Sequence, residues 1–203
     1  MSGRRIVLAS GNAQKAVELA RVLPGWDVQA FCGELPEETG DTFVANALLK
    51  ARHVFAATGG GDWVLADDSG IEAAALQGAP GVRSARYAGE DATDEQNLAK
   101  LMGALAESDD RRVRYVAELV AIAPGGGEVS ARGELTGTLA AAPRGTGGFG
   151  YDPAFVPDGE TRTVAEMSPG EKDAISHRAR AARALLPLLA KSVPGTDFAS
   201  GEA

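Results

Sequence analysis

The sequence predicts an α/β protein with a mixed sheet, and two patterns along the chain support this class. In the first third, short apolar runs alternate with amphipathic helical segments, which is typical of strands connected by helices. Further on, two long β-type runs flank Pro124 and the three glycines after it, which predicts an antiparallel hairpin. A sheet that contains both kinds of connection is mixed.

Each expected element follows from its own local pattern. Pro24 and Gly25 end the first helix, and three glycines at 59–61 end the second, which Asp41 or Thr42 caps. The expected strands are 5–9, 26–31, 63–66, 112–123 and 128–139, and the expected helices are 13–23, about 42–58, 93–105 and 173–190. Glycine-containing loops are expected at 78–89 and 144–150, with 1–191 forming a single domain and 192–203 a solvated tail.

The composition is that of an ordinary globular protein, with 44% apolar and 24% charged residues. The longest apolar runs, at 6–9 and 185–190, fall far short of the roughly 18–20 residues of a membrane-spanning helix. The single cysteine, Cys32, excludes an internal disulfide and a zinc site built from cysteines. The first apolar run is too short for a signal peptide, so these features predict a cytoplasmic protein with no membrane partner.

The net charge of −8 argues weakly against a surface that coats nucleic acid, because such surfaces are usually basic. It does not exclude a small anionic substrate, since a pocket needs only a few cations brought together locally. A site for such a substrate is expected where lysine, arginine and free amide groups gather.

The first candidate motif lies where a strand ends and a helix begins. A helix N-terminus offers unpaired amide groups and a partial positive charge, which suit a phosphate. Gly11 lets the backbone approach a ligand, and Lys15 lies one turn into the helix. An ordinary strand–turn–helix with Asn12 as the N-cap is the alternative. The motif consists of Ser10, Gly11, Asn12, Ala13, Gln14 and Lys15.

The second motif is Asp67-Asp68-Ser69-Gly70, which follows an apolar strand. Ligands of α/β sheets gather beyond the carboxyl ends of strands. Two adjacent carboxylates repel each other unless a cation or hydrogen bonds offset the repulsion, so a metal-linked site is expected here, with an acidic turn as the alternative. Adjacent strand residues point to opposite faces, so one aspartate should face the site while the other braces the loop or a ligand.

Two further motifs come late in the chain. Four glycines between 145 and 150 surround Phe149 and precede Tyr151 and Asp152, which suits an open backbone beside a ring that stacks on a base. A flexible hairpin connection is the alternative. Lys172, Ser176, His177 and Arg178 then offer donors to a carbonyl or phosphate oxygen, unless they form a solvated helix face.

These motifs together resemble the inosine triphosphate pyrophosphatase family, the dITP/XTP pyrophosphatases that remove aberrant purine nucleotides. The resemblance covers residues 5 to about 190. The motifs that carry it are, in chain order, Ser10-Gly11-Asn12 with Lys15, Glu37-Glu38-Thr39-Gly40, Asn46-Ala47 with Lys50-Ala51-Arg52, Ala66-Asp67-Asp68-Ser69-Gly70, Gly78-Ala79-Pro80-Gly81 with Ser84-Ala85-Arg86-Tyr87, Gly145 to Asp152, and Glu171-Lys172 with Ile175-Ser176-His177-Arg178.

The resemblance implies an elongated fold of two lobes with the active cleft between them, a homodimer, and Mg²⁺-dependent release of pyrophosphate from ITP, dITP and XTP. It implies that Asp68 is the general base and a metal ligand, and that Glu38 is a second metal ligand. By the same resemblance, the substrate is bound by Ser10, Gly11, Asn12, Ala13, Gln14, Lys15, Lys50, Ser69, Phe149, Gly150, Tyr151, Asp152, Lys172, His177 and Arg178.

These residues support a mechanism in which a water activated by the metal or by Asp68 attacks the α-phosphorus in line. Lys15 and Lys50 would offset the charge that builds on the leaving pyrophosphate. Hypoxanthine and xanthine carry an oxygen at C6 where adenine carries an amino group, so donors from His177 and Arg178 would favour them.

Two other functions stay open at this point. The same phosphate machinery could serve a nucleotide pyrophosphatase with a different base preference, for example for a modified or pyrimidine nucleotide, which would differ only around Phe149, His177 and Arg178. A non-catalytic nucleotide sensor would need the phosphate loop and the stacking ring, but not the acidic set. Carboxylates near a triphosphate oppose binding unless a metal is present, which favours catalysis.

Overall fold

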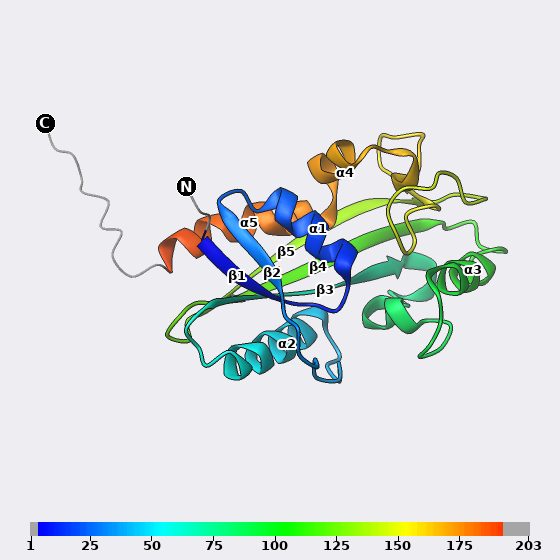
Figure 1. Cartoon of the computed structure of the whole chain (residues 1–203). Coiled ribbons are helices and arrows are strands. Elements are labelled where there is room, and N and C mark those ends of the chain that lie inside the picture. Colours follow the sequence, from blue (N-terminus) through cyan, green and yellow to red (C-terminus); the bar gives the residue numbers. More distant parts are fainter. Residues whose placement is uncertain (1–3, 193–203) are drawn as a thin grey trace, which may run out of the picture.

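The computed structural model describes residues 4–192. Figure 1 shows a long twisted sheet with helices on both of its faces. The elements are β1 (Arg4–Ala9), α1 (Ala13–Val22), β2 (Trp26–Ala30), α2 (Phe43–Ala57), β3 (Trp63–Ala73), η1 (Ala74–Leu76), η2 (Gly81–Arg86), α3 (Asp94–Ala104), β4 (Arg112–Ile122), β5 (Glu128–Leu139), β6 (Phe155–Pro157), η3 (Val164–Glu166), α4 (Pro169–Ile175) and α5 (His177–Lys191).

The six strands form one sheet in the order β2-β1-β3-β4-β5-β6. Strand β1 pairs in parallel with β2 and β3, whereas β3 with β4, β4 with β5, and β5 with β6 are antiparallel. The predicted α/β class, the mixed sheet and the β4–β5 hairpin are therefore confirmed.

Helices cover both faces of the sheet in the part that contains β1 and the first half of β3. Ile6 and Leu8 of β1 share a buried cluster with residues of α1 and α5, such as Leu185. Val7, between them, belongs to a different cluster with Ala47 of α2. The alternation follows from the two-residue repeat of a strand, and Figure 1 shows α1 and α5 on one side of the sheet and α2 on the other.

A third apolar cluster fills the far end of the sheet, where α3 packs. Ile71 of β3 and Leu101 of α3 are fully buried in it. On the same face of β3, Leu65 belongs to the cluster beneath α1 and α5. Asp67 and Ser69 lie between these two positions, so polar side chains interrupt the core where the resemblance expects a cleft.

Strand β3 is longer than predicted. The expectation that it ends at 66 is wrong, because β4 pairs with it from Val64 to Ala73 and keeps it extended. Pairing with β1, however, stops at Ala66. The stretch that begins at Asp67 therefore has a neighbouring strand on one edge and the β1–α1 junction on the other.

The predicted helix at 173–190 is divided in two. Ser176 is extended, with φ −61° and ψ 152°, and separates α4 from α5. Its hydroxyl accepts a hydrogen bond from the amide of Ala179 and so caps α5. The break places His177 and Arg178 in the first turn of α5, beside the polar stretch of β3.

Residues 193–203 of the predicted tail lie outside the described residues. Between residues 4 and 192, no helix is long and apolar enough to cross a membrane.

We expect Gly133→Ala to destabilise the fold by about 1–3 kcal/mol, the usual cost of overpacking. A Cβ at 133 would lie 2.1 Å from the carbonyl oxygen of His177 and 2.3 Å from the amide nitrogen of Ala181, so α5 would have to move away from β5. Urea unfolding followed by circular dichroism measures the change.

The matched control is Gly103→Ala, inside α3. A Cβ there meets nothing within 4 Å, so alanine should stabilise the helix by up to about 1 kcal/mol through its higher helix propensity. If the two variants had the same stability, the close contact between β5 and α5 would not hold.

Candidate active site

The β1–α1 junction forms one side of the candidate site. The side chain of Asn12 caps α1 and accepts hydrogen bonds from the amides of Gln14 (2.9 Å) and Lys15 (3.1 Å). The amide of Asn12 in turn donates to the hydroxyl of Ser10. A Cβ on Gly11 would meet nothing within 4 Å, so the backbone is open there. Because Asn12 already holds two of the amides, a phosphate at this junction would depend strongly on the Lys15 ammonium.

A buried ionic cluster lies on the face of the sheet that α1 and α5 cover, and we call it the arginine cluster. Arg178 holds it together: its Nε lies 2.8 Å from Asp67 Oδ2, and its Nη1 lies 2.5 Å from Glu18 Oε2. Its Nη2 also donates to the hydroxyl of Ser69. The members of the cluster are Lys15, Glu18, Asp67, Asp152, Lys172 and Arg178.

Lysines complete the arginine cluster at both ends. Lys15 Nζ lies 2.5 Å from Asp67 Oδ1. Lys172 Nζ lies 2.7 Å from Glu18 Oε1 and 2.6 Å from Asp152 Oδ2. The cluster thus joins three cations to three carboxylates and carries no net formal charge.

Asp67 is the carboxylate at the centre of this cluster and is fully buried. Burial alone raises the pKa of Asp67, but the charges of Arg178 and Lys15 outweigh it and hold the pKa far below its usual range. Asp67 is therefore a permanently charged brace between β3, α1 and α5.

A second ionic group, the lysine cluster, lies on the face that α2 covers. Lys50 Nζ lies 2.5 Å from Glu38 Oε1 and 3.2 Å from Asp68 Oδ1, and it also donates to the backbone oxygen of Asp67 at 2.8 Å. Arg86 adds a second contact to Glu38. The members are Glu38, Lys50, Asp68 and Arg86, two cations and two carboxylates.

Asp68 is nearly buried and its carboxylate is held from two sides. Asn46 Nδ2 donates to Asp68 Oδ2 at 3.2 Å, while Lys50 approaches the other oxygen. Burial raises the pKa of Asp68 despite the opposing charge of Lys50, and the negative charge of Glu38 adds to the rise. The carboxyl group is therefore more basic than an ordinary aspartate, which suits an acceptor of protons.

The two aspartates point to opposite faces of β3, as the alternation of a strand requires. The faces nevertheless communicate, because β1 stops pairing at Ala66 and leaves the edge of β3 beside the β1–α1 junction. The carboxyl end of a parallel strand is where ligands of α/β sheets bind. Both ionic clusters are therefore within reach of one ligand placed at this edge.

A cavity of about 110 Å³ opens beside the arginine cluster. The ring of Phe149 forms one wall, with Lys172 Nζ 4.8 Å and Arg178 Cζ 5.7 Å from its centroid. The predicted residues that line the cavity are Asn12, Lys15, Ser69, Phe149, Gly150, Tyr151, Asp152, Lys172, His177 and Arg178, joined by Gly70, Ser84, Ala85, Asp94 and Tyr115.

His177 lines this cavity and also carries a buried polar atom without a partner. Its ring stacks on Tyr115 at 4.6 Å between centroids, and its Nδ1 is the one buried side-chain atom without a hydrogen-bond partner among residues 4–192. Burial and the nearby charge of Arg178 lower the pKa of His177 well below its usual range, so the imidazole is neutral. Arg178, by contrast, already uses four of its five donors on Asp67, Glu18 and Ser69.

The lysine cluster offers oxygen ligands to a divalent metal. Glu38 and Asp68 converge on one lysine, but no described group of three or more histidine, cysteine, aspartate or glutamate side chains could hold a metal. Two carboxylates suit a hard cation such as Mg²⁺, which keeps several waters and shares substrate phosphates, and do not suit zinc. The residues therefore fit a metal that arrives with its substrate.

Comparison with known proteins decides the family. Residues 6–188 match the model of the Ham1 family. The chain belongs to this family. A protein named dITP/XTP pyrophosphatase from Mycobacterium bovis is 48% identical, over 94% of this chain and 98% of the relative. A relative of the same name from Shigella flexneri is 46% identical, over 92% of this chain and 98% of the relative.

Solved Ham1 structures have the same fold. The Ham1 protein of Staphylococcus aureus matches with a TM-score of 0.82 and 36% identity, covering 94% of this chain and all of that one. A HAM1 protein from Coxiella burnetii matches with a TM-score of 0.83 and 40% identity, covering 93% and 100%. The family resemblance that the sequence motifs indicated is confirmed.

The Ham1 chain also contains site residues that the sequence motifs missed. Glu18 is buried between Arg178 and Lys172. Its position three residues after Lys15 placed it on the same face of α1, so an acid on the buried side of a helix was a usable signal. Tyr115, whose hydroxyl donates to Asp152 at 3.0 Å, lies in an ordinary β run and gave no signal.

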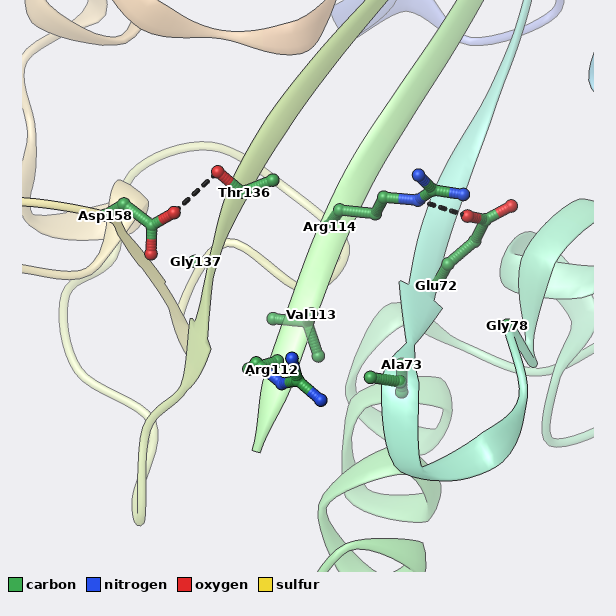
Figure 2. A pocket seen from close by; sticks show the side chains of 10 residues that line it. Glu72, Ala73, Gly78, Arg112, Val113, Arg114, Thr136, Gly137 and Asp158 are labelled. Carbon is green, nitrogen blue, oxygen red and sulfur yellow. Dashed lines mark hydrogen bonds and ion pairs between the residues drawn. The ribbon is translucent and has the colours of Figure 1, made fainter. Parts of the chain in front are cut away.

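A larger hollow lies away from this site, at the far end of the sheet. Figure 2 shows its ion pair between Arg114 and Glu72 and the hydrogen bond from Thr136 to Asp158. Its volume is about 460 Å³, and the described residues that line it include none of the predicted site residues. The two arginines that line it, Arg112 and Arg114, are already paired with carboxylates, so we assign the chemistry to the smaller cavity.

Asp67→Asn is expected to lower the free energy of unfolding by about 3–5 kcal/mol, because the buried Arg178 loses one of its two charged partners and Lys15 loses its own. Asp68→Asn should leave the free energy of unfolding unchanged or raise it slightly. The folded-state pKa of Asp68 is raised, so its ionised form costs stability at neutral pH, and the amide removes that cost. Urea unfolding at pH 7 without divalent metal measures both variants.

The two substitutions are chemically identical and lie on adjacent residues, so each is the control for the other. Equal losses of stability would contradict the different roles assigned to the two carboxylates.

Proposed function

We propose that this chain hydrolyses aberrant purine nucleoside triphosphates, namely dITP, ITP and XTP, to the monophosphate and pyrophosphate. The observation that carries the proposal is that one strand serves two sites. Asp67 lies beside a cavity with an aromatic wall, and the next residue, Asp68, is a buried carboxylate that shares Lys50 with Glu38 on the other face. The names of the similar proteins support the same reaction.

Asp68 is the general base in this proposal. It takes a proton from a water that attacks the α-phosphorus in line, and the bond between the α-phosphorus and the bridging oxygen breaks as pyrophosphate leaves with the electron pair. The hydrogen bond from Asn46 and the contact with Lys50 fix the carboxylate in place. A divalent metal bound beside it would keep the carboxylate ionised, as a base must be.

The phosphates are held by cations from both faces of β3. Lys15 and Lys50 offset charge on the triphosphate, and the open backbone at Gly11 lets the phosphates approach the helix start that Ser10, Asn12, Ala13 and Gln14 also form. Ser69, which already contacts Arg178, contributes a hydroxyl at the same edge.

A charge count explains why a metal is required. The arginine cluster and the lysine cluster each balance their own charges, so neither offers surplus positive charge to a triphosphate. Mg²⁺ held by Glu38 and Asp68 would supply the charge that neutralises the phosphate oxygens. Without it, the carboxylates would repel the substrate.

The base lies against Phe149 in this proposal, flanked by the backbone of Gly150 and by Tyr151, Asp152 and Lys172. Stacking on a ring contributes roughly 1–3 kcal/mol per base and does not depend on which base it is. Selectivity needs a hydrogen bond, and the neutral ring of His177, which lines the cavity, is the proposed donor to the 6-oxygen of hypoxanthine or xanthine. Arg178, with one donor left, has a smaller share than the sequence suggested.

We further propose that residues 1–191 act as one two-lobed unit, and that two copies form a homodimer in the cytoplasm with no nucleic-acid or membrane partner. The polar stretch between the apolar clusters of β3 supports the two lobes. The net charge of −8 supports the absence of a nucleic-acid partner. The single cysteine, which forms no internal disulfide, is consistent with a reducing compartment such as the cytoplasm.

The wild-type protein with Mg²⁺ should release pyrophosphate from dITP and XTP far faster than from dATP or dUTP, and excess chelator should stop the release. Asp68→Asn should lower kcat by about 10²–10⁴, the usual contribution of base catalysis, while the protein stays folded. A coupled pyrophosphate assay on the nucleotide panel measures both. A nucleotide sensor would bind dITP and leave it intact, which would overturn the proposal.

His177→Phe should lower the preference for dITP over dATP in kcat/KM by roughly 5- to 100-fold, the range expected when a buried polar group loses its hydrogen bond. The phenyl ring keeps the stack on Tyr115 and removes only the polar atoms. The same substitution at the exposed His53 is the control and should change nothing. If His177→Phe kept the wild-type preference for dITP over dATP, a group other than His177 would have to recognise the 6-oxygen.

A further inference from the structure

Lys50 occupies the place where two candidate metal ligands meet. Its ammonium lies 2.5 Å from Glu38 and 3.2 Å from Asp68, and only 6% of its side chain is exposed. The backbone oxygen of Asp67 accepts a third hydrogen bond from the same nitrogen. All three hydrogens of the ammonium therefore have partners in the nucleotide-free protein.

Lys50 offsets the repulsion between the two carboxylates when no metal is bound to them. Two carboxylates that share a site repel each other, and a positive charge between them offsets the repulsion. A divalent cation bound by the same carboxylates would lie a few ångström from the ammonium. Even at the dielectric constant of water, a unit charge that close to a divalent ion costs about 2 kcal/mol, so the two cations compete.

We propose that Lys50 is a built-in cation of the metal site, and that metal binds tightly only when a triphosphate draws the lysine away from Glu38 and Asp68. In the nucleotide-free protein the ammonium holds the two carboxylates together. When substrate arrives, the ammonium moves to phosphate oxygens and the carboxylates become available to the metal. This inference rests on the proposed function, because it assumes that a triphosphate and a metal meet at this site.

Other cations nearby do not fit this role. Lys15 bonds Asp67 on the opposite face of β3 and contacts neither metal ligand. Arg86 lies 3.5 Å from Glu38 and also holds its backbone oxygen, so it fixes the loop without bridging to Asp68. Lys50 is the bridging residue because α2 places it over both carboxylates.

The consequence is coupling between two ligands. Metal alone and nucleotide alone should each bind weakly, and each should strengthen the other beyond what a metal–nucleotide complex in solution provides. In such a site Lys50 outcompetes free divalent cations for the two carboxylates, and the metal binds tightly only when substrate is present.

Binding of Mn²⁺ to the nucleotide-free protein, followed by electron paramagnetic resonance of the free ion, tests the proposal. Lys50→Met should bind Mn²⁺ about tenfold more tightly or better than the wild type, because the competing charge is gone. Lys15→Met removes a charge that pairs with Asp67 and does not lie between the two metal ligands, so it should raise Mn²⁺ affinity clearly less than Lys50→Met does. Lys50→Arg keeps the charge and should also bind Mn²⁺ weakly.

Two outcomes would overturn the proposal: Mn²⁺ affinity in Lys50→Met no higher than in the wild type, or an equal gain in Lys15→Met. If Lys50→Met does not fold, Lys50→Gln replaces it with the same expectation, since its amide can still donate to one carboxylate. A non-hydrolysable dITP analogue should raise Mn²⁺ affinity more in the wild type than in the lysine variant, and equal gains would also overturn it. None of these measurements involves turnover, so they fail independently of the pyrophosphate assay.

Discussion

The buried ion pair between Asp67 and Arg178 is the contact on which the site depends. It joins the middle of β3 to the first turn of α5 across 111 residues of sequence. Lys15 and Glu18 attach α1 to the same pair, so three elements meet at one charged centre. A buried pair of this kind adds little net stability compared with apolar packing, but losing one partner is costly. Its value here is the placement of Phe149 and His177 around a cavity.

The charged residues on the two faces of β3 have different surroundings, and this gives Asp67 and Asp68 opposite pKa shifts. On one face, charges are matched so completely that Asp67 stays ionised at any ordinary pH. On the other, burial leaves Asp68 with a raised pKa although Lys50 is close. Adjacent residues of one strand thus have opposite electrostatic environments, because the pleat directs them to different surroundings.

Much of this arrangement could be predicted from the sequence. The alternation of strands and helices, the hairpin around Pro124 and the family motifs depend on local patterns, and all three were recovered. The end of β3 could not be predicted, because Asp67 to Gly70 resemble a turn, and only pairing with β4 keeps them extended. The break at Ser176 was missed for a similar reason: the flanking residues all favour helix, and the serine hydroxyl caps the next helix instead of continuing the first.

The sequence could identify site residues that belong to a motif. It could not show which hydrogen bonds and ion pairs each residue makes with segments far away in the chain. His177 and Arg178 look equivalent in the sequence, yet one is left with an unpaired nitrogen and the other is almost fully bonded. Glu18 has no motif of its own, and its role follows only from the approach of α5 to α1. Burial and pairing are properties of the folded chain, so local patterns cannot reveal them.

The continuity of β3 sets a limit on redesign of this enzyme. Asp67 bonds Arg178 beside the proposed base cavity, Asp68 is the proposed general base, and a single peptide bond joins them. Exchanging the partners of Arg178 to accept a new base would shift the strand that carries this proposed base. Base preference and turnover are therefore not separable modules in this fold, and variants selected for one should be screened for the other.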